Sequence, residues 1–484
     1  MMHFLRLLLY ALTVVLLALP AANAQFDDHY WTHQYGAKGL LLNGAVIAST
    51  EDETAVFYNP GALGKGEDFG LSVSFLTPTY SVLTTDGYLG RNTEANNRRL
   101  GFSSDLSAVG FRPFKSHRFR AAVTSFSRYK SSLNLREREV GPVFNEPNQL
   151  FIGNLDFRRS VSERWFGGGM AYRINDNLSV GASHFLTFHS ESTSLSIQKE
   201  IVDKDNPFNL ALGWSTRFKY SLSTKAGMLT KFGMTANWGN VKLGATATTT
   251  TYYYFAKKAG YDVADLRVFG NDSTVLVANF ASATLYDYKS PWSVGLGADF
   301  RIGRTRVSLS TEYFDHIPRY TVIDAVDDPF DGLANGNHSV ATKVQLENRS
   351  VLNVAIGLQT RLRNEQSIIM GFRTDFNQRI IDQGLPTLSF LSTSPSVFHF
   401  SLGSLFKLKQ NQLSIGADFA FGKKITAGQL VDLTNITPEN LFGFSETGII
   451  ESRYRSVVFI FTYDFILKSW KDWRKRKNDE KGGL

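Results

Sequence analysis

The sequence contains one pair of residues with the spacing of metal ligands. His29 and His33 lie four residues apart, and Asp27 and Asp28 precede them. On a helix the two imidazoles share one face, which is the spacing that some zinc sites use. No third ligand is evident, and the absence of cysteine excludes thiolate metal sites. We therefore predict neither a metal site nor a cofactor.

Motifs of hydrolytic and nucleotide-dependent enzymes are missing from the sequence. It has no G-x-S-x-G elbow, no Walker loop and no H-E-x-x-H pair. The triplet Asn337-His338-Ser339 places a hydroxyl beside an imidazole, but it lies in a long polar stretch without a recognisable partner. We predict that the protein is not an enzyme.

Charged residues recur on the polar face of segments whose other face is apolar. Several of these segments contain an Asp followed by a Phe, which places the carboxylate on the polar side and the ring on the apolar side. Desolvated charges need partners, so we predict ion pairs among them or with a segment in an enclosed interior. The predicted set is Asp299, Arg301, Arg361, Arg373, Asp375, Asp418 and Asp464. The alternative is a hydrated interior that solvates the same charges.

The segments that position these charges alternate regularly. The apolar face of residues 291–302 comprises Trp292, Val294, Leu296, Ala298, Phe300 and Ile302. Residues 351–363, 366–377, 397–408 and 456–467 repeat the pattern, and each has about the 9–11 residues of a strand that crosses a bilayer. A single hydrophobic core could hardly bury so many apolar faces, so the pattern predicts an antiparallel transmembrane β-barrel whose apolar faces contact lipid. A large soluble β-sandwich is the alternative, since its strands also alternate.

The N-terminus predicts export. Arg6 lies in a short basic region, Leu7 to Leu19 are apolar, and Ala22-Asn23-Ala24 is a cleavage site, so residues 1–24 are predicted to be a signal peptide. No later stretch has the ~18 consecutive apolar residues of a transmembrane helix. We predict that the protein is located in the bacterial outer membrane, in contact with its lipid.

The net charge of +8 does not indicate a nucleic-acid partner. Part of the basic excess lies in residues 468–484, after the last strand, and an exported protein has little access to nucleic acid. We predict a basic periplasmic tail there. Trp470 and Trp473 among its lysines and arginines suit an anionic membrane surface, whereas a solvated tail is the alternative.

Short polar turns, such as residues 238–241 and 302–305, alternate with long polar stretches along the sequence, which is typical of outer-membrane barrels. Counting the hairpins gives about fourteen strands within residues 68–467, with a lumen too wide for the wall's own side chains to fill. Residues 25–67 precede the first strand and contain apolar residues, such as Leu40 to Leu42, that are costly to expose. We predict that they form a plug, or hatch, with short helices in the lumen.

The predicted plug contains the sequence ASTEDETAVFYNPGAL, residues 48–63. Thr50 and Glu53 have the spacing of a capping box, which predicts a helix starting at Glu51. Pro60 ends that helix because it disfavours helical geometry at Asn59, and Gly61 is conformationally permissive. The motif residues at this bend are Phe57, Tyr58, Asn59, Pro60 and Gly61.

With this motif ahead of the first strand, the whole mature chain resembles the FadL-type outer-membrane transporters of long-chain fatty acids and other hydrophobic molecules. The plug of that family carries an Asn-Pro-Ala motif; Asn59 and Pro60 match its first two positions, and Gly61 replaces the usual Ala. Residues 27–50 are more similar to the members of Bacteroidetes-type bacteria than to the enterobacterial ones.

The resemblance implies uptake of a hydrophobic small molecule, such as a fatty acid, by a monomer in which residues 57–61 gate diffusion past the plug. Members of the family often release the ligand sideways at a kinked strand, but the third strand, near residues 118–127, has no Gly or Pro to mark a kink. A barrel of this family that serves protein secretion, with a secretion-system partner, or a structural role is the alternative. A hydrophilic-solute porin is a third class, against which the apolar plug argues.

Overall fold

The structure is a computed structural model, and it describes residues 28–65, 70–74, 77–87, 94–103, 106–114, 116–206, 210–255, 259–270, 273–324, 343–362, 365–380, 394–408, 411–427, 441 and 449–465. The predicted signal peptide, the basic tail and the triplet Asn337-His338-Ser339 lie outside these residues.

The described chain is almost entirely antiparallel β structure, which confirms the predicted all-β class. The strands are β1 (Gly70–Ser74), β2 (Thr77–Asp86), β3 (Glu94–Ser103), β4 (Leu106–Phe111), β5 (Phe119–Val143), β6 (Glu146–Arg173), β7 (Leu178–Asp203), β8 (Leu210–Trp238), β9 (Val241–Thr248), β10 (Tyr252–Phe255), β11 (Ala259–Phe269), β12 (Ser273–Thr284), β13 (Ser293–Ile302), β14 (Thr305–Phe314), β15 (Ile317–Asp324), β16 (Lys343–Asn348), β17 (Val351–Arg361), β18 (Gln366–Asp375), β19 (Val397–Leu408), β20 (Asn411–Ala427) and β21 (Ile449–Phe465). Among the described residues, no helix is long and apolar enough to cross a membrane.

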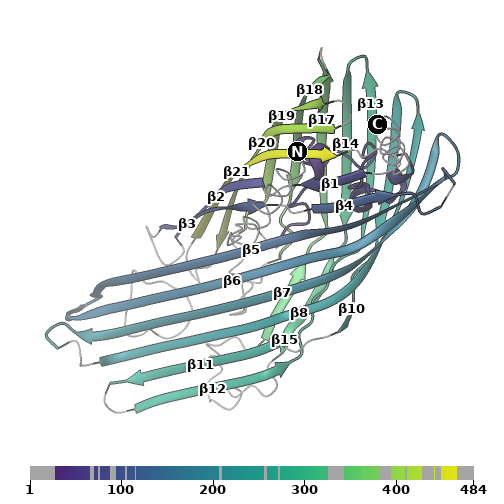
Figure 1. Ribbon diagram of the computed structural model, residues 1–484. Coiled ribbons are helices and arrows are strands. Elements are labelled where there is room, and N and C mark those ends of the chain that lie inside the picture. The colour runs from purple at the N-terminus through teal and green to yellow at the C-terminus, as the bar shows by residue number, and fades with distance from the viewer. Residues whose placement is uncertain are drawn as a thin grey trace, which may run out of the picture.

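The strands pair mostly with their neighbours in the chain, and the last strand pairs with the first (Figure 1). β21 lies between β20 and the interrupted strand formed by β1 and β2, with Leu71 opposite Phe465 and Tyr80 opposite Val457. β4 and β3 pair with β1 and β2 in turn. β9, β10 and β11 pair with successive parts of the long strand β8.

The two ends of the strands differ. At one end tight turns join them, and Gly239 and Gly303 occupy these turns with φ of 68° and 61°, which favours glycine. These turns lie where the sequence predicts them, after Trp238 and Ile302. At the other end β5 to β8 extend over 25, 28, 26 and 29 residues, far more than the ~9–11 that cross a bilayer.

The strands expose their apolar faces outward, as the alternating pattern predicts. On β17, Leu352 and Ile356 have 53% and 42% of their surface exposed, whereas their neighbours Asn353 and Ala355 are fully buried. On β13, Leu296 is exposed and Asp299 is buried. On these two strands, polar or small residues therefore face the interior at most of the alternate positions.

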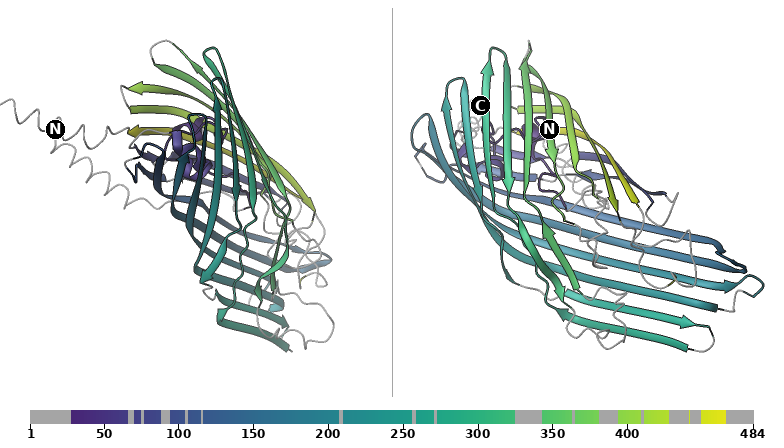
Figure 2. Two further views of the ribbon diagram at one scale, coloured as in Figure 1. Left: turned by 90° about the vertical axis from the view of Figure 1, so that its right-hand side faces the viewer. Right: turned by 180° about the vertical axis from the view of Figure 1, so that it is seen from behind.

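Residues 28–65, which we call the N-terminal segment, lie inside the ring of strands (Figure 2). The segment contains helix α2 (Gly36–Leu41), helix α3 (Ala55–Tyr58) and the 3₁₀ helix η1 (Pro60–Lys65). Its Leu41 and Leu63 are buried in an apolar cluster with Phe126 of β5 and Phe185 of β7. Apolar residues of the wall therefore cover the segment on the side of the longest strands.

The predicted start of the helix at Glu51 is wrong, because α3 begins at Ala55. The Thr50 hydroxyl donates to the carbonyl of Val46 at 2.7 Å instead of capping the helix. The carboxylate of Asp52 accepts from the Thr54 amide at 2.9 Å. These local side-chain bonds to the backbone compete with helix formation over residues 50–54.

Candidate functional site

The bend at Asn59 is bonded to the wall at β7 and β8. The side-chain amide of Asn59 donates to the carbonyls of Ile47 and Met234, at 2.8 and 3.0 Å. Its oxygen accepts from the Gly61 amide at 3.0 Å. The hydroxyl of Ser179 donates to the Gly61 carbonyl at 2.5 Å. One asparagine thus joins two parts of the N-terminal segment and the backbone of β8.

Glycines of the wall let the backbone of the segment approach closely at this bend. A Cβ added to Gly233 would lie 2.2 Å from Asn59 Oδ1, and one added to Gly181 would lie 2.5 Å from the Pro60 carbonyl oxygen. A Cβ on Gly61 itself would lie 2.7 Å from the Gly233 carbonyl oxygen. Gly61, where the resemblance expects Ala, therefore matches the close approach of β8, and this packing explains the glycine without any need for a flexible bend.

Further charged contacts hold the N-terminal segment near the end of the wall where tight turns join the strands. Glu53 pairs with Arg120 of β5 at 2.7 Å, and both side chains are buried. Burial raises the pKa of the Glu53 carboxyl, and the attraction of Arg120 opposes this rise. Glu51 pairs with Lys242 of β9. Burial raises the pKa of Glu51, but Lys38 and Lys242 outweigh it, so the pKa lies below its usual value.

Within the N-terminal segment, Tyr58 bonds to other residues of the segment, whereas Phe57 packs against the wall. The hydroxyl of Tyr58 accepts from the Tyr35 amide at 2.7 Å and donates to Gln34 Oε1 at 3.0 Å. Burial raises the pKa of this phenol. The ring of Phe57 contacts those of Tyr35 and Phe126 edge-on, with centroids 4.9 and 5.1 Å apart.

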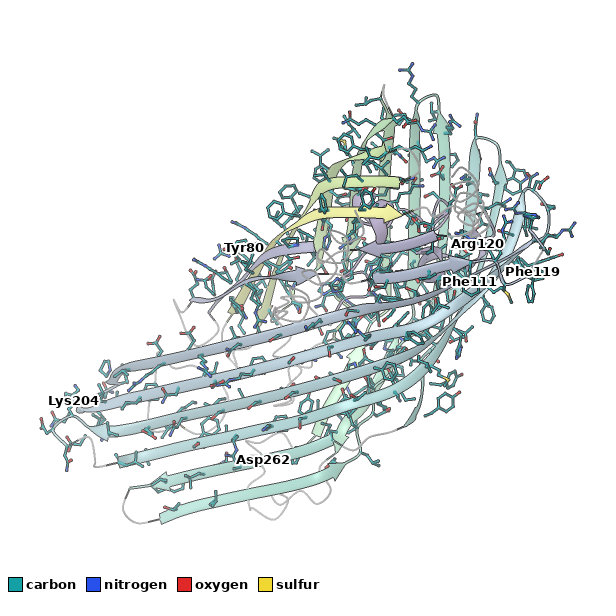
Figure 3. The ribbon with its side chains drawn as sticks, in the orientation of Figure 1. Tyr80, Phe111, Phe119, Arg120, Lys204 and Asp262 are labelled. Atoms are coloured by element: carbon teal, nitrogen blue, oxygen red, sulfur yellow. The ribbon has the colours of Figure 1, made fainter. Side chains whose placement is uncertain are left out.

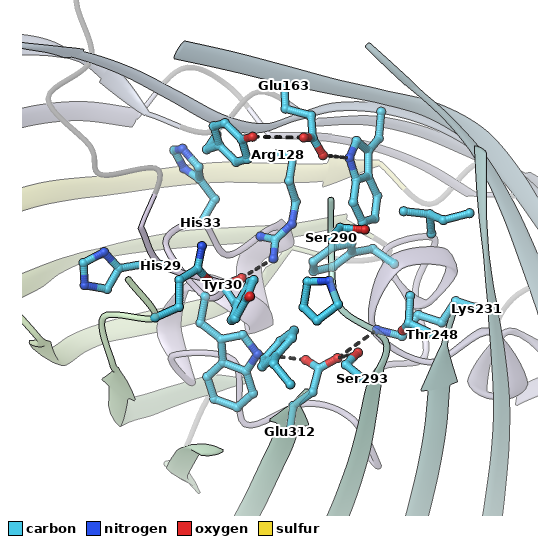
Figure 4. A pocket seen from close by; sticks show the side chains of 18 of the residues that line it. His29, Tyr30, His33, Arg128, Glu163, Lys231, Thr248, Ser290, Ser293 and Glu312 are labelled. Carbon is cyan, nitrogen blue, oxygen red and sulfur yellow. Dashed lines mark hydrogen bonds and ion pairs between the residues drawn. The ribbon is translucent and has the colours of Figure 1, made fainter. Parts of the chain in front are cut away.

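The N-terminal segment and the wall enclose a cavity next to Phe57, with about 1090 Å³ of space that is partly open to solvent (Figure 4). Its lining combines charged and polar side chains with eight aromatic ones. The aromatic residues are Tyr30, Trp31, Phe57, Tyr58, Tyr129, Trp165, Tyr288 and Phe314. The rings can contact an apolar ligand, while the charged and polar groups can fix its orientation.

Two cations lie against the aromatic lining of this cavity. The guanidinium of Arg128 lies 5.6 Å from the ring centroids of both Phe57 and Trp165, and it donates to the Tyr30 carbonyl. The ammonium of Lys231 lies 5.4 Å from the Phe57 centroid. Attraction between a cation and an aromatic face is worth ~0.5–2 kcal/mol, more where water is excluded.

The two cations differ in how their charge is balanced. Lys231 is buried and lies 3.8 Å from Glu312, whose carboxylate also accepts from the Trp31 indole at 2.8 Å and from the Ser293 hydroxyl at 2.7 Å. Arg128 forms none of the ion pairs found among the described residues. Two further cations of the lining are also paired, Lys289 with Asp287 and Arg379 with Asp28. Among the described residues, Arg128 is therefore the lining cation that no carboxylate contacts directly.

A β-bulge positions Arg128. The register of β5 against β6 shifts between Ser127 and Tyr129, so that Arg128 is the extra residue. Bulges re-aim side chains in this way, and Figure 4 shows Arg128 pointing into the cavity. Arg128 could not be predicted from the alternating pattern because the bulge breaks that pattern. Lys231 and Glu312 were also missed, although they follow the inward alternation of β8 and β14 and could have been recognised from it.

Three of the predicted charged residues meet around the N-terminal segment. Arg373 donates to Asn43 Oδ1 at 2.8 Å and to the Thr32 carbonyl at 3.2 Å. Asp418 accepts from Asn43 at 3.0 Å, and Asp375 accepts from the Trp31 amide at 3.0 Å. His399, which the sequence analysis did not select, lies 2.9 Å from Asp418 and 3.0 Å from Arg373.

The other predicted charges lie elsewhere. Asp299 pairs with Arg306 at 3.2 Å and accepts from the Ser308 hydroxyl at 2.7 Å, so its partners belong to the neighbouring strand β14. Arg301 and Arg361 are at exposed positions near strand ends. Asp464 pairs through its backbone with Ser72, and its side chain lies outside the described part of the structure.

His29 and His33 do not share the face of a helix, because they precede α2. His29 Nε2 lies 3.0 Å from the Pro395 carbonyl oxygen. Both histidines line the aromatic cavity and a second, smaller one beside Arg373. The described residues contain no group of three or more His, Asp or Glu that could hold a metal ion.

Solved structures of channels share this architecture. A FadL homologue of Pseudomonas aeruginosa has a TM-score of 0.53 at 12% identity, over 90% of this chain and 99% of that chain. The P. putida toluene transporter TodX has a TM-score of 0.54 at 12% identity, over 90% and 99%. A deltaS2 mutant of the TodX monoaromatic hydrocarbon channel has 0.57 at 14% identity, over 92% and 100%.

No protein-family profile and no curated protein matches the sequence, so the similarity to known proteins is one of fold. The structural matches extend over nearly the whole length of both chains. The chain therefore has the fold of the FadL-type channels, which is the family that the Asn59-Pro60 motif indicated.

Proposed function

We propose that the protein is an outer-membrane channel that takes up hydrophobic small molecules. The cavity between the N-terminal segment and the wall carries this proposal, because it offers a site within the ring that aromatic rings and a few cations line. The outward apolar faces of β13 and β17 suit acyl chains. The solved structures of this fold include TodX, which is described as a toluene transporter and as a monoaromatic hydrocarbon channel.

In this proposal the strands close a barrel of about fourteen membrane-crossing strands, residues 68–467, in a monomer. Residues 25–67 act as the plug, and the motif from Phe57 to Gly61 takes part in gating, since Asn59 joins the segment to β8. Ligand passes by binding and diffusion when the segment shifts. No bond is made or broken in the ligand.

Arg128 favours a ligand that carries a carboxylate, such as a long-chain fatty acid. Its guanidinium has no carboxylate partner among the described residues and lies on the aromatic wall of the cavity. A guanidinium binds a carboxylate in a charge-assisted, often bidentate manner, while Phe57, Trp165 and their neighbours contact the hydrocarbon chain.

The substitution Arg128→Met tests this assignment. We expect the affinity for an added C18 fatty acid to fall by about tenfold or more, because a hydrogen bond to a charged group contributes ~1.5–3 kcal/mol. The affinity for toluene should stay within about twofold. Arg118→Met, at an exposed position outside the cavity, serves as the control. Calorimetric titration in detergent measures the affinities of the natural protein and of both variants for each ligand. An equal loss of affinity for both ligands in Arg128→Met would contradict a role of Arg128 in carboxylate binding.

The closed barrel has its own test. We expect the folded protein to fractionate with the outer membrane, and its unboiled form to migrate faster on a denaturing gel than its boiled form, because a sealed barrel resists unfolding by detergent. Organic extracts of the purified protein should also contain a hydrophobic molecule by mass spectrometry. The channel would be refuted if the boiled and unboiled forms migrated identically, no hydrophobic molecule were extracted and no added ligand bound. The secretion or structural alternative would then remain.

A further inference from the structure

The outward face of the long strands changes character along their length. Near the tight turns it is apolar, with Phe166 of β6, Phe188 of β7 and Phe232 of β8 exposed by 49%, 40% and 53%. Farther along β7 the outward residues are Ser190, Ser192, Ser194 and Ser196. The apolar band therefore ends near Phe188, although the sheet of β5 to β8 continues well beyond it (Figure 1).

Beyond this limit two neighbouring rows of the sheet collect charged side chains. Residues directly opposite one another across the strands face the same side of the sheet. One row comprises Asn134, Arg158, Ser194, Lys219 and Asp262. The next row comprises Arg136, Asp156, Ser196, Arg217 and Ala264. Figure 3 marks Asp262 on β11 at the edge of this surface.

These rows present more cations than carboxylates. We call Arg136, Arg158, Arg217 and Lys219 the cationic band. The side chains of Arg136, Arg158 and Arg217 are exposed by 60%, 53% and 56%, so a molecule outside the sheet can reach their guanidinium groups. Two carboxylates lie among them: Asp156, 3.0 Å from Arg136 and 2.7 Å from Arg158, and Asp262, 3.2 Å from Arg217. The surface therefore keeps a positive charge and is rich in serine hydroxyls.

The opposite face of the same strands is apolar and already covered. Phe157, Ile197, Trp214 and Phe218 point inward from β6, β7 and β8 into one buried cluster. The outer face is thus the free one. The rows lie six to eight residues beyond Phe188, which is about 20–27 Å along a strand and about 14–19 Å above the apolar band for strands tilted by ~45°.

We propose that the cationic band binds the phosphorylated saccharide headgroups of the outer-leaflet glycolipid, lipopolysaccharide. This rests on the proposed outer-membrane channel, which places the long strand ends outside. The band then lies at headgroup height beside the lipid that surrounds the barrel. Phosphates pair with its arginines and lysine, and the serine rows donate to phosphate and sugar oxygens. Basic clusters next to a membrane bind anionic lipid in this way.

The test compares two fourfold serine variants of the full chain in detergent. One carries Arg136→Ser, Arg158→Ser, Arg217→Ser and Lys219→Ser. The control carries Arg112→Ser, Arg118→Ser, Arg304→Ser and Lys407→Ser, which remove the same charge from the turns at the other end. Intrinsic tryptophan fluorescence measures the binding of purified, phosphorylated lipopolysaccharide and of the same material after enzymatic dephosphorylation.

We expect the band variant to bind phosphorylated lipopolysaccharide about tenfold or more weakly than the natural chain and the control, since each basic residue near an anionic surface contributes ~1 kcal/mol. Dephosphorylated material should bind the natural chain as weakly as it binds the variant. Equal binding by band variant and natural chain, or an equal loss in the control, would overturn the proposal.

The same variants keep this test separate from that of the channel. Their heat-dependent gel migration and their binding of the C18 fatty acid in the cavity should match those of the natural chain, because the band lies outside the ring. If the natural chain bound neither the fatty acid nor toluene and migrated identically with and without boiling, the channel would be refuted. The ratio of lipopolysaccharide affinities between the natural chain and the band variant is a separate quantity, and it decides the proposal on the cationic band.

Discussion

A valine at Gly233 should open the lumen to ions. A Cβ there would lie 2.2 Å from Asn59 Oδ1, 2.7 Å from Pro60 Cδ and 2.8 Å from the Gly61 nitrogen, so the bend must leave its position on β8. Overpacking of this kind costs ~1–3 kcal/mol, and each 1.4 kcal/mol changes an equilibrium tenfold. We therefore expect the conductance of the protein in planar lipid bilayers to rise by about tenfold or more.

A matched substitution separates this effect from a general defect of a strand. Gly141 of β5 has no neighbour within 4 Å of an added Cβ, so Gly141→Val should leave the conductance within about twofold of the natural value, as expected for unstrained sites. Gly233→Ala should give an intermediate rise. All variants must keep the heat-dependent gel migration of the folded protein. Unchanged conductance of a folded Gly233→Val protein would show that the bend does not seal the lumen.

Replacing Arg373 with methionine should weaken the hold on the other half of the N-terminal segment. Arg373 is 3% exposed and joins Asn43 and the Thr32 carbonyl to the wall. Without Arg373, the buried carboxylate of Asp418 and its neighbour His399 lose the positive charge beside them. Breaking a buried charge network by removing one partner costs ~3–5 kcal/mol. We expect a lower unfolding temperature in detergent and higher conductance.

Arg361 provides the comparison, because it belongs to the same predicted set of interior charges as Arg373. It is exposed at the end of β17, so Arg361→Met should change the free energy of unfolding by less than ~0.5 kcal/mol. Unfolding temperatures read from the gel shift measure both variants. Equal effects of the two substitutions would mean that the N-terminal segment does not depend on the network around Arg373.

Much of the fold could be predicted because alternation decides which face of a strand a residue occupies. Leu352, Ile356 and Leu296 are exposed where the pattern placed them outside, and Asp299 is buried where it placed the residue inside. The same rule failed at Arg128, since one extra residue at the bulge after Ser127 breaks the period of two. The helix start failed at Thr50 because its hydroxyl bonds to Val46.

The sequence by itself determined the alternating segments such as β13 and β17 with their two faces, the tight turns at Gly239 and Gly303, and the bend at Pro60, but not the extension of β5 to β8 to 25–29 residues. Each of these follows from residues close together in the chain, through a period of two or a local dihedral preference. Only the tertiary structure decided that Arg373 meets Asn43 and that Asp299 meets Arg306 instead. The face of a strand that a residue occupies depends only on its neighbours in the chain. Its partner across the lumen depends on strand register and on the position of a segment that can be more than three hundred residues away in the sequence.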